Sequence, residues 1–300
     1  MRLLARIAVT GSVFLIPLVG MARSAEAPRF TPINPELKTK AIYGSDDRKD
    51  WKDVRSTKLK MWAKSTMALI NVHDLEKTGD AFKIKAPTYE TFANLCPGTQ
   101  FGKQLTPGFC SGFLVGPDLI LTAGHCISNL AECNETAFVF DFAVTDAWST
   151  AETVQESQIY KCKELISREL NAKFDYALIQ LDHSPNRPYF PVRRVGQPVA
   201  KTKLTMIGHP AGLPSKISDG GEIVKMDQRI HRIIGSVDAF GGNSGSVVIN
   251  RRTGRAEGIL VAGEPDFEPQ GACMIEKVCG PECDGEEIFP VSLISHLIPE

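Results

Sequence analysis

Short runs of apolar residues, separated by turn-forming residues, fill most of the chain after residue 67. Runs of this length bounded by Pro, Gly, Asn or Asp are typical of β-strands. Turn signals include Pro117-Asp118 and the stretch 250–254 (Asn-Arg-Arg-Thr-Gly). The predicted strands are Ala68–Val72, Gly112–Val115, Leu119–Thr122, Ala137–Val144, Tyr176–Leu181, Lys203–Ile207, Arg232–Val237, Ser246–Ile249 and Gly258–Val261.

Helical patterns are confined to two segments, Leu165–Leu170 and Val291–Leu297. The stretch 73–107 is long, mixed in polarity and contains Pro and Gly, which indicates an insertion or extended loops. Many short strands with few short helices are typical of barrels or sandwiches. The pattern therefore predicts an all-β fold.

The N-terminal 25 residues have a basic start, an apolar middle and small residues before residue 26. This order is typical of a secretory signal peptide. The apolar run is short for a membrane span, although an uncleaved anchor is the alternative. We therefore predict a signal peptide over 1–25, a secreted or periplasmic protein, and no stable membrane association.

The stretch 26–64 is polar, with three early prolines and many charges, and predicts an N-terminal extension or pro-segment. The remaining 65–300 then forms the functional domain. A chain of 300 residues with 43% hydrophobic content is large enough for one large or two small domains. Its net charge of -1, without a dense run of Lys or Arg, argues against nucleic acid as a partner.

Eight cysteines are present, and an even number in an exported chain favours disulfides. Cys273, Cys279 and Cys283 lie in an acidic C-terminal stretch, which raises zinc as an alternative. Their spacing matches no familiar zinc finger. We expect disulfides, no metal and no cofactor.

Three residue types needed to activate a hydroxyl occur in suggestive settings. Ser244 lies within Gly241–Ser246 (Gly-Gly-Asn-Ser-Gly-Ser), where small neighbours allow a tight turn. His125 lies within Thr122–Cys126, and Asp175 begins an apolar run. A serine needs a neutral imidazole to take its proton, and a buried carboxylate orients that imidazole. Backbone donors must then meet the oxyanion.

These motifs resemble those of trypsin-like serine proteases. The resemblance rests on Cys110–Val115 with Leu121–Cys126, on Asp175–Ile179 and on Gly242–Ser246, in the His, Asp, Ser order of that family. The Asn-Ser-Gly-Ser form, together with Ile42–Arg48, is most similar to the bacterial glutamyl-endopeptidase-type branch. The resemblance covers roughly residues 40–300.

The resemblance implies a fold of two six-stranded antiparallel β-barrels with a short C-terminal helix. His125 and Asp175 would lie on the first barrel and Ser244 on the second. Ser244 would be the nucleophile, His125 the general base and Asp175 the orienting carboxylate, with Asp141 as a weaker competitor for the last role. The N–H groups of Gly242 and Ser244 would bind the oxyanion.

The resemblance also implies a disulfide between Cys110 and Cys126, around the histidine loop. Pairing of Cys133 with Cys162 is a second, weaker expectation. The pairing of the remaining cysteines stays open at this point.

Two positions depart from the family patterns. Asn243 stands where animal enzymes carry an aspartate that pairs with the freed N-terminal amine, so any proteolytic activation must work differently. The stretch Gly258–Gly263 lacks the histidine that glutamyl endopeptidases place there. Glutamyl specificity is therefore not expected.

Asp238 lies six residues before Ser244, where trypsin has the aspartate of its primary pocket. Such a carboxylate would select substrate Arg or Lys, because an unpaired buried charge is costly. Alternatively, Asp238 ends a strand or binds a loop. The resemblance further implies that Val261, Ala262 and Gly263 pair with the substrate backbone.

These observations predict a monomeric, exported serine endopeptidase that acts on proteins or peptides through an acyl-enzyme. Cleavage after basic residues is the specificity hypothesis. The alternative is a catalytically silent binding module with the same fold.

Overall fold

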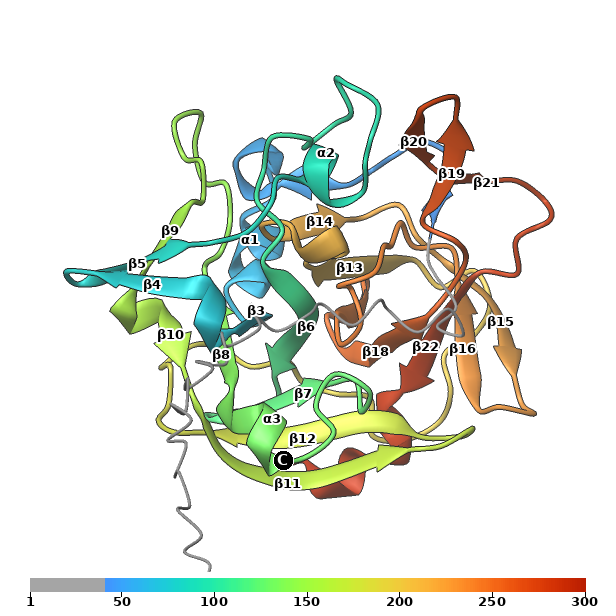
Figure 1. Cartoon of the computed structure of the whole chain (residues 1–300). Helices are drawn as coiled ribbons and strands as arrows, with labels where there is room; N and C mark the ends of the chain where they lie inside the picture. The colour runs from blue at the N-terminus through green and yellow to red at the C-terminus, as the bar shows by residue number, and fades with distance from the viewer. Residues whose placement is uncertain (1–40) are drawn as a thin grey trace, which may run out of the picture. The chain divides into compact units, whose positions relative to one another are not determined.

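The computed structural model describes residues 41–300, so the predicted signal peptide and the stretch 26–40 lie outside the described residues. The two largest sheets of the described chain are antiparallel and curled, as Figure 1 shows. The helices within residues 41–300 are few and short. The all-β, two-barrel prediction is therefore confirmed.

The first sheet provides the framework for the histidine and aspartate motifs. Its strands are β3 (Thr66–Asn71), β6 (Gly108–Leu114), β7 (Leu119–Thr122), β8 (Thr136–Phe140), β10 (Ile159–Tyr160), β11 (Cys162–Leu170) and β12 (Asp175–Leu181). They are arranged in the order β10-β8-β3-β6-β7-β12-β11. The strands β6 and β7 are consecutive in the chain and adjacent in the sheet, whereas β3 lies between β6 and β8.

The second sheet provides the framework for the serine motif. Its strands are β2 (Lys49–Asp50), β13 (Leu204–Gly208), β14 (Lys216–Ser218), β15 (Ile223–Asp227), β16 (Arg232–Gly235), β17 (Val247–Asn250), β18 (Ala256–Ala262) and β22 (Glu286–Pro290). Their order is β15-β16-β22-β18-β17-β13-β14-β2. The sheets thus have seven and eight strands rather than six each, because short strands such as β10 and β2 extend their edges.

Besides the two large sheets, the described chain contains smaller sheets and short helices. The strands β4 (Leu75–Thr78), β5 (Ala81–Ile84) and β9 (Thr153–Gln155) form a three-stranded sheet, and β19 (Phe267–Gln270) pairs with β20 (Cys273–Glu276). The strand β1 (Ile42–Tyr43) pairs in parallel with β21 (Val278–Cys279). The α-helices are α1 (Thr57–Ala63), α2 (Tyr89–Phe92) and α3 (Leu130–Asn134).

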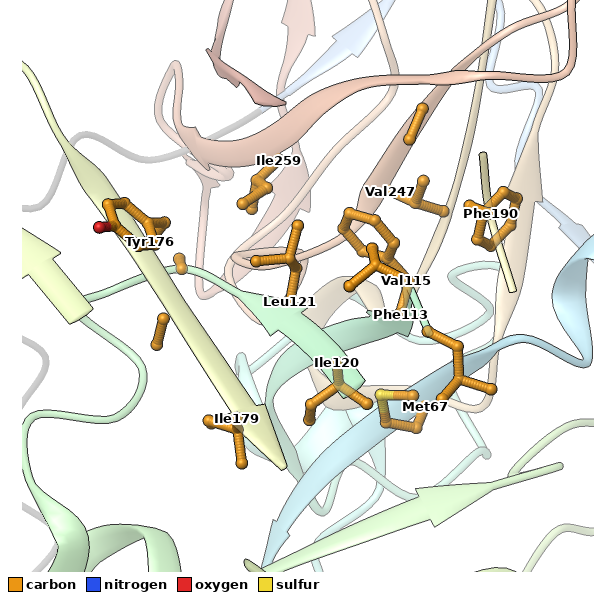
Figure 2. Packing of buried hydrophobic residues seen from close by; sticks show 14 of the residues in the cluster. Met67, Phe113, Val115, Ile120, Leu121, Tyr176, Ile179, Phe190, Val247 and Ile259 are labelled. Atoms are coloured by element: carbon orange, nitrogen blue, oxygen red, sulfur yellow. The ribbon is translucent and has the colours of Figure 1, made fainter. Parts of the chain in front are cut away.

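One hydrophobic cluster joins the inner faces of both sheets. Phe113 and Leu121 from the first sheet are fully buried with Val247 and Ile259 from the second. Figure 2 shows these side chains directed into the same region. Burial of apolar area at about 25 cal/mol per Å² makes this shared core a main stabilising contribution. It also fixes the two sheets against each other.

The helix predicted over Leu165–Leu170 is wrong. This segment belongs to β11, and it pairs with β12 from Leu165↔Ile179 to Leu170↔Asp175. Partial exposure along much of the strand and two bulges blur the two-residue period, which explains the misleading pattern. The predicted C-terminal helix is present as two short 3₁₀ turns, Val291–Leu293 and Ser295–Leu297.

The domain begins earlier than the predicted boundary at residue 65. In the described part of the chain, β2 pairs with β14 and α1 precedes β3 directly. The buried ammonium of Lys216 lies 2.8 Å from Asp50, so the segment before residue 65 is fixed by an ion pair as well. Residues 41–64 are therefore part of the folded domain.

Four disulfides account for all eight cysteines. The predicted bridges Cys110–Cys126 and Cys133–Cys162 are both present. The pairings that the sequence left open are Cys96–Cys273 and Cys279–Cys283. Cys96–Cys273 ties the inserted stretch 73–107 to the β19-β20 hairpin. Because no cysteine is free, the disulfide interpretation holds over the zinc alternative.

Candidate active site

His125 and Asp175 are brought together by the pairing of β7 with β12. Thr122, the last residue of β7, faces Ala177 in the register, so the loop that follows passes over the start of β12. Nδ1 of His125 lies 2.8 Å from Oδ2 of Asp175. The backbone N–H of His125 also donates to Oδ1 of Asp175, at 3.1 Å. Both carboxylate oxygens therefore orient the histidine.

Close packing of the histidine loop explains a glycine in its motif. A Cβ at Gly124 would lie 2.5 Å from the carbonyl oxygen of Glu169 and 2.8 Å from that of Tyr176. Only glycine allows the loop to approach the two strands this closely. The adjacent Cys110–Cys126 disulfide ties the loop to β6.

Ser244 lies in the loop 241–246, between β16 and β17, and is 8% exposed. Its carbonyl oxygen accepts a hydrogen bond from the backbone N–H of Ser111 on β6, at 2.8 Å. The sulfur of Cys126 lies 3.7 Å from the same oxygen. The structure thus places the backbone of Ser244 beside Cys126, the residue that follows His125.

Positive backbone φ angles on both sides of Ser244 require glycine. Gly242 has φ +86° and Gly245 has φ +89°. The carbonyl of Gly241 accepts a hydrogen bond from the N–H of Ala211, which fixes the peptide that carries the N–H of Gly242. Among residues 41–300, no acceptor contacts that N–H.

A buried turn at 209–212 packs against the loop 241–246, which we call the serine loop. A Cβ at Gly242 would lie 2.7 Å from both the N of Gly212 and the carbonyl oxygen of His209. The imidazole of His209 is stacked on Phe142, and its Nδ1 lies 2.9 Å from the carbonyl oxygen of Leu213. Burial lowers the pKa of His209 to about 4, so the ring is neutral at pH 7 and Nδ1 is the donor.

The predicted substrate strand passes directly beside the serine loop. Leu260 on β18 exchanges backbone hydrogen bonds with Gly245 and Ser246, at 2.8 and 3.0 Å. Val261, Ala262 and Gly263 follow in sequence. The hydrogen bonds of Leu260 therefore fix the start of this segment relative to the loop that carries Ser244.

Asp238 has a different environment from that of an open specificity residue. It is 4% exposed, and its two oxygens accept the backbone N–H groups of Tyr43 and Asp47 at 2.7 and 2.8 Å. Burial raises the pKa of Asp238 above its ordinary value, against the opposite effect of the two backbone hydrogen bonds. The alternative that Asp238 binds a loop matches these contacts. They argue against Asp238 as the partner of a substrate cation.

Two acidic residues near the substrate strand were missed by sequence reasoning. A Cβ at Gly263 would lie 1.9 Å from Oε2 of Glu286, so this carboxylate packs against the glycine. Asp266 accepts the backbone N–H of Gly241 at 2.9 Å. The only sequence signal was the excess of acidic residues in the stretch 264–287, which gave no position.

The competing candidates lie elsewhere. Asp141 forms a salt bridge with Arg187 and has no contact with a histidine among the described residues. A metal ion has no evident place at the histidine, since its cysteine neighbours, Cys110 and Cys126, are joined to each other. Within residues 41–300, no helix is long and apolar enough to cross a membrane.

Comparisons with known proteins identify the family and the fold. The family model described as a trypsin-like peptidase domain matches residues 110–259. No curated protein matches the sequence. The fold is similar to that of HBP, with a TM-score of 0.51 and 12% identity over 83% of this chain and 93% of that chain.

Two further solved structures have lower TM-scores. A Glu endopeptidase has a TM-score of 0.49 and 18% identity over 85% of this chain and 97% of that one. The serine endoprotease from Yersinia pestis has a TM-score of 0.48 and 17% identity over 81% of this chain and 66% of that one.

The chain belongs to the trypsin-like peptidase family, whose model covers half of it. Its class is that of a serine endopeptidase with a chymotrypsin-like fold.

The buried His209 predicts a loss of stability at acid pH. Its folded-state pKa is depressed, so the stability is fully present above pH 6.5 and is lost as pH falls toward 4. A shift of this size corresponds to about 3 kcal/mol of unfolding free energy. We expect His209→Gln to remove about this much of the difference between pH 7.5 and pH 4, measured by urea unfolding. Parallel pH curves for the two proteins would contradict the assignment.

Proposed function

We propose that this protein is an exported serine endopeptidase that hydrolyses peptide bonds through an acyl-enzyme at Ser244. The single observation that carries the proposal is the double hydrogen bond between His125 and Asp175. The carbonyl of Ser244 accepts a hydrogen bond from Ser111 on β6, and the sulfur of Cys126, the residue after His125, lies 3.7 Å from the same oxygen. A histidine oriented by a carboxylate, with a serine held near it on a glycine turn, is the arrangement that acyl transfer needs.

Each residue has a defined task in this mechanism. His125 takes the proton of Ser244 as the hydroxyl oxygen attacks the substrate carbonyl, and Asp175 stabilises the imidazolium that forms. The N–H groups of Gly242 and Ser244 bind the developing oxyanion. His125 then protonates the leaving amine, and water releases the acyl group by the reverse sequence.

The substrate backbone is proposed to pair with Val261, Ala262 and Gly263. Addition of an extended peptide to a strand uses main-chain hydrogen bonds for affinity and side-chain pockets for specificity. The hydrogen bonds of Leu260 with Gly245 and Ser246 support this role, because they fix the start of the segment relative to the nucleophile.

Cleavage after Arg or Lys is the proposed specificity, with Glu286 in place of Asp238 as the acidic group. Both carboxylate oxygens of Asp238 are engaged by backbone donors. Glu286 is also fully buried, and its Oε1 accepts the backbone N–H of Ala41 and the hydroxyl of Tyr43, but its Oε2 packs against Gly263 of the substrate segment. An ammonium or guanidinium next to it would form a charge-assisted hydrogen bond.

Export is proposed from the N-terminal signal pattern and from the disulfides. Four bridges account for the eight cysteines of the described chain, and such bridges persist in oxidising compartments. A secreted or periplasmic location satisfies both observations.

Replacing the nucleophile tests the reaction. We expect Ser244→Ala to lower the rate of peptide hydrolysis by about four to six orders of magnitude, because no other group replaces the attacking oxygen. The rate is measured with a fluorogenic peptide mixture, and thermal unfolding serves as the control for folding. Hydrolysis at the wild-type rate, or a wild-type protein that hydrolyses nothing, would contradict the proposal.

Replacing the acidic groups tests the specificity. We expect Glu286→Gln to lower kcat/KM for Arg and Lys substrates relative to neutral ones by about tenfold, since losing a desolvated charge partner costs at least about 1.4 kcal/mol. The measurement is a peptide library varied at the residue before the cut. Exposed Glu268 on β19 provides the matched control, Glu268→Gln. An unchanged preference in Glu286→Gln, or its loss in Asp238→Asn alone, would contradict the assignment.

A further inference from the structure

Ser111 is a fully buried residue of β6 that contacts the serine loop through both its backbone and its side chain. Its N–H donates to the carbonyl of Ser244 at 2.8 Å. Its hydroxyl donates to the carbonyl of Gly242, also at 2.8 Å. One residue of the first sheet therefore binds both ends of the tripeptide 242–244 in the second.

The two carbonyls held by Ser111 belong to Gly242 and Ser244, whose N–H groups are the proposed oxyanion donors. Gly242 has no side chain to restrict its conformation, so its φ and ψ must be set by what its neighbouring peptides bind. The peptide before it is fixed through the carbonyl of Gly241 and the N–H of Ala211. The peptide after it is fixed through the hydroxyl of Ser111.

The direction of the Ser111 hydroxyl is itself determined. The backbone N–H of His209 donates to Oγ of Ser111 at 2.9 Å. A hydroxyl has a single hydrogen, which is left to bind the carbonyl of Gly242. The fully buried His209 is held in turn by Phe142 and the carbonyl of Leu213. Ser111 thus links the rigid turn 209–212 to the serine loop.

We infer that Ser111 is a positioning residue for the oxyanion hole, which aligns the N–H groups of Gly242 and Ser244 by holding the carbonyls of the same residues. The inference rests on the proposed peptidase function. Ser111 does not touch the substrate in this account. It acts by keeping the donors oriented before the reaction, so that no reorganisation is needed when the charge develops.

The expected effect follows from the value of such donors. Removal of one oxyanion donor lowers kcat by about 10² to 10³-fold. Loss of the Ser111 hydroxyl leaves both donors present but less well aligned, so a decrease in kcat of about 10 to 100-fold is expected. KM stays within about twofold, because the ground-state carbonyl depends little on these donors.

The experiment compares Ser111→Ala and Ser111→Thr with the control Thr136→Val in the full mature protein. Thr136 on β8 is 3% exposed, and its hydroxyl donates to the carbonyl of Glu132, outside the serine loop. The control therefore removes a buried hydroxyl of the same kind. The readouts are kcat, KM, thermal midpoint and the affinity of a peptide boronic acid, whose adduct with serine is tetrahedral and places an oxygen in the oxyanion hole.

We expect Ser111→Ala to lower kcat and boronic acid affinity, with KM nearly unchanged. Ser111→Thr, which keeps the hydroxyl, should retain most of the wild-type kcat. Thr136→Val should lower only the thermal midpoint. A Ser111→Ala protein with the kcat of the control overturns the inference, as does a folded Ser111→Thr protein no faster than Ser111→Ala. Either result leaves the proposed function standing, because wild-type hydrolysis and its loss in Ser244→Ala test that function separately.

Discussion

The constraint on which the site depends is the backbone contact between β6 of the first sheet and the loop 241–246 of the second. A Cβ at Gly245 would lie 1.9 Å from the carbonyl oxygen of Ser111, so the contact tolerates no side chain at this position. The glycine next to Ser244 is thus needed for the approach of the two sheets as well as for the turn. The common hydrophobic core holds the sheets at this distance.

The serine loop is also stabilised from within, which accounts for the departure at Asn243. This residue is fully buried, and its side-chain oxygen accepts the hydroxyl of Ser246 at 3.0 Å. A neutral amide suits this environment because burial of an unpaired carboxylate is costly. The N-terminal segment is bound elsewhere, by Asp238 and by Glu286 through the N–H of Ala41. The loop therefore does not use an aspartate ion pair at residue 243.

Much of the fold and of the site could be predicted from the sequence. The apolar runs gave the strands because most of these strands are buried along nearly their whole length. The motifs gave the positions that the pairing of β7 with β12 brings together. The segment Leu165–Leu170 was misread because bulges and partial exposure hide the strand period. Within residues 41–300, the apolar pattern therefore identified strands whose residues are buried throughout, and it failed at the partly exposed, bulged strand β11.

The remaining parts of the site depend on contacts between distant segments, which sequence pattern does not encode. Ser111 lies 131 residues from Gly242, and its role follows only from the approach of the two sheets. The engagement of Asp238 by Tyr43 spans 195 residues. The spacing of Asp238 from Ser244 does not reveal these contacts, because their donors come from the N-terminal segment.

The most direct measurement is labelling of the purified mature protein with a fluorophosphonate, with the adduct located by mass spectrometry. The probe reacts with a serine whose hydroxyl is activated by a neighbouring base. The account predicts a single adduct at Ser244 that is lost in His125→Ala while the protein remains folded. Equal labelling of Ser244 in His125→Ala, or no labelling of the wild-type protein, would contradict an assembled site.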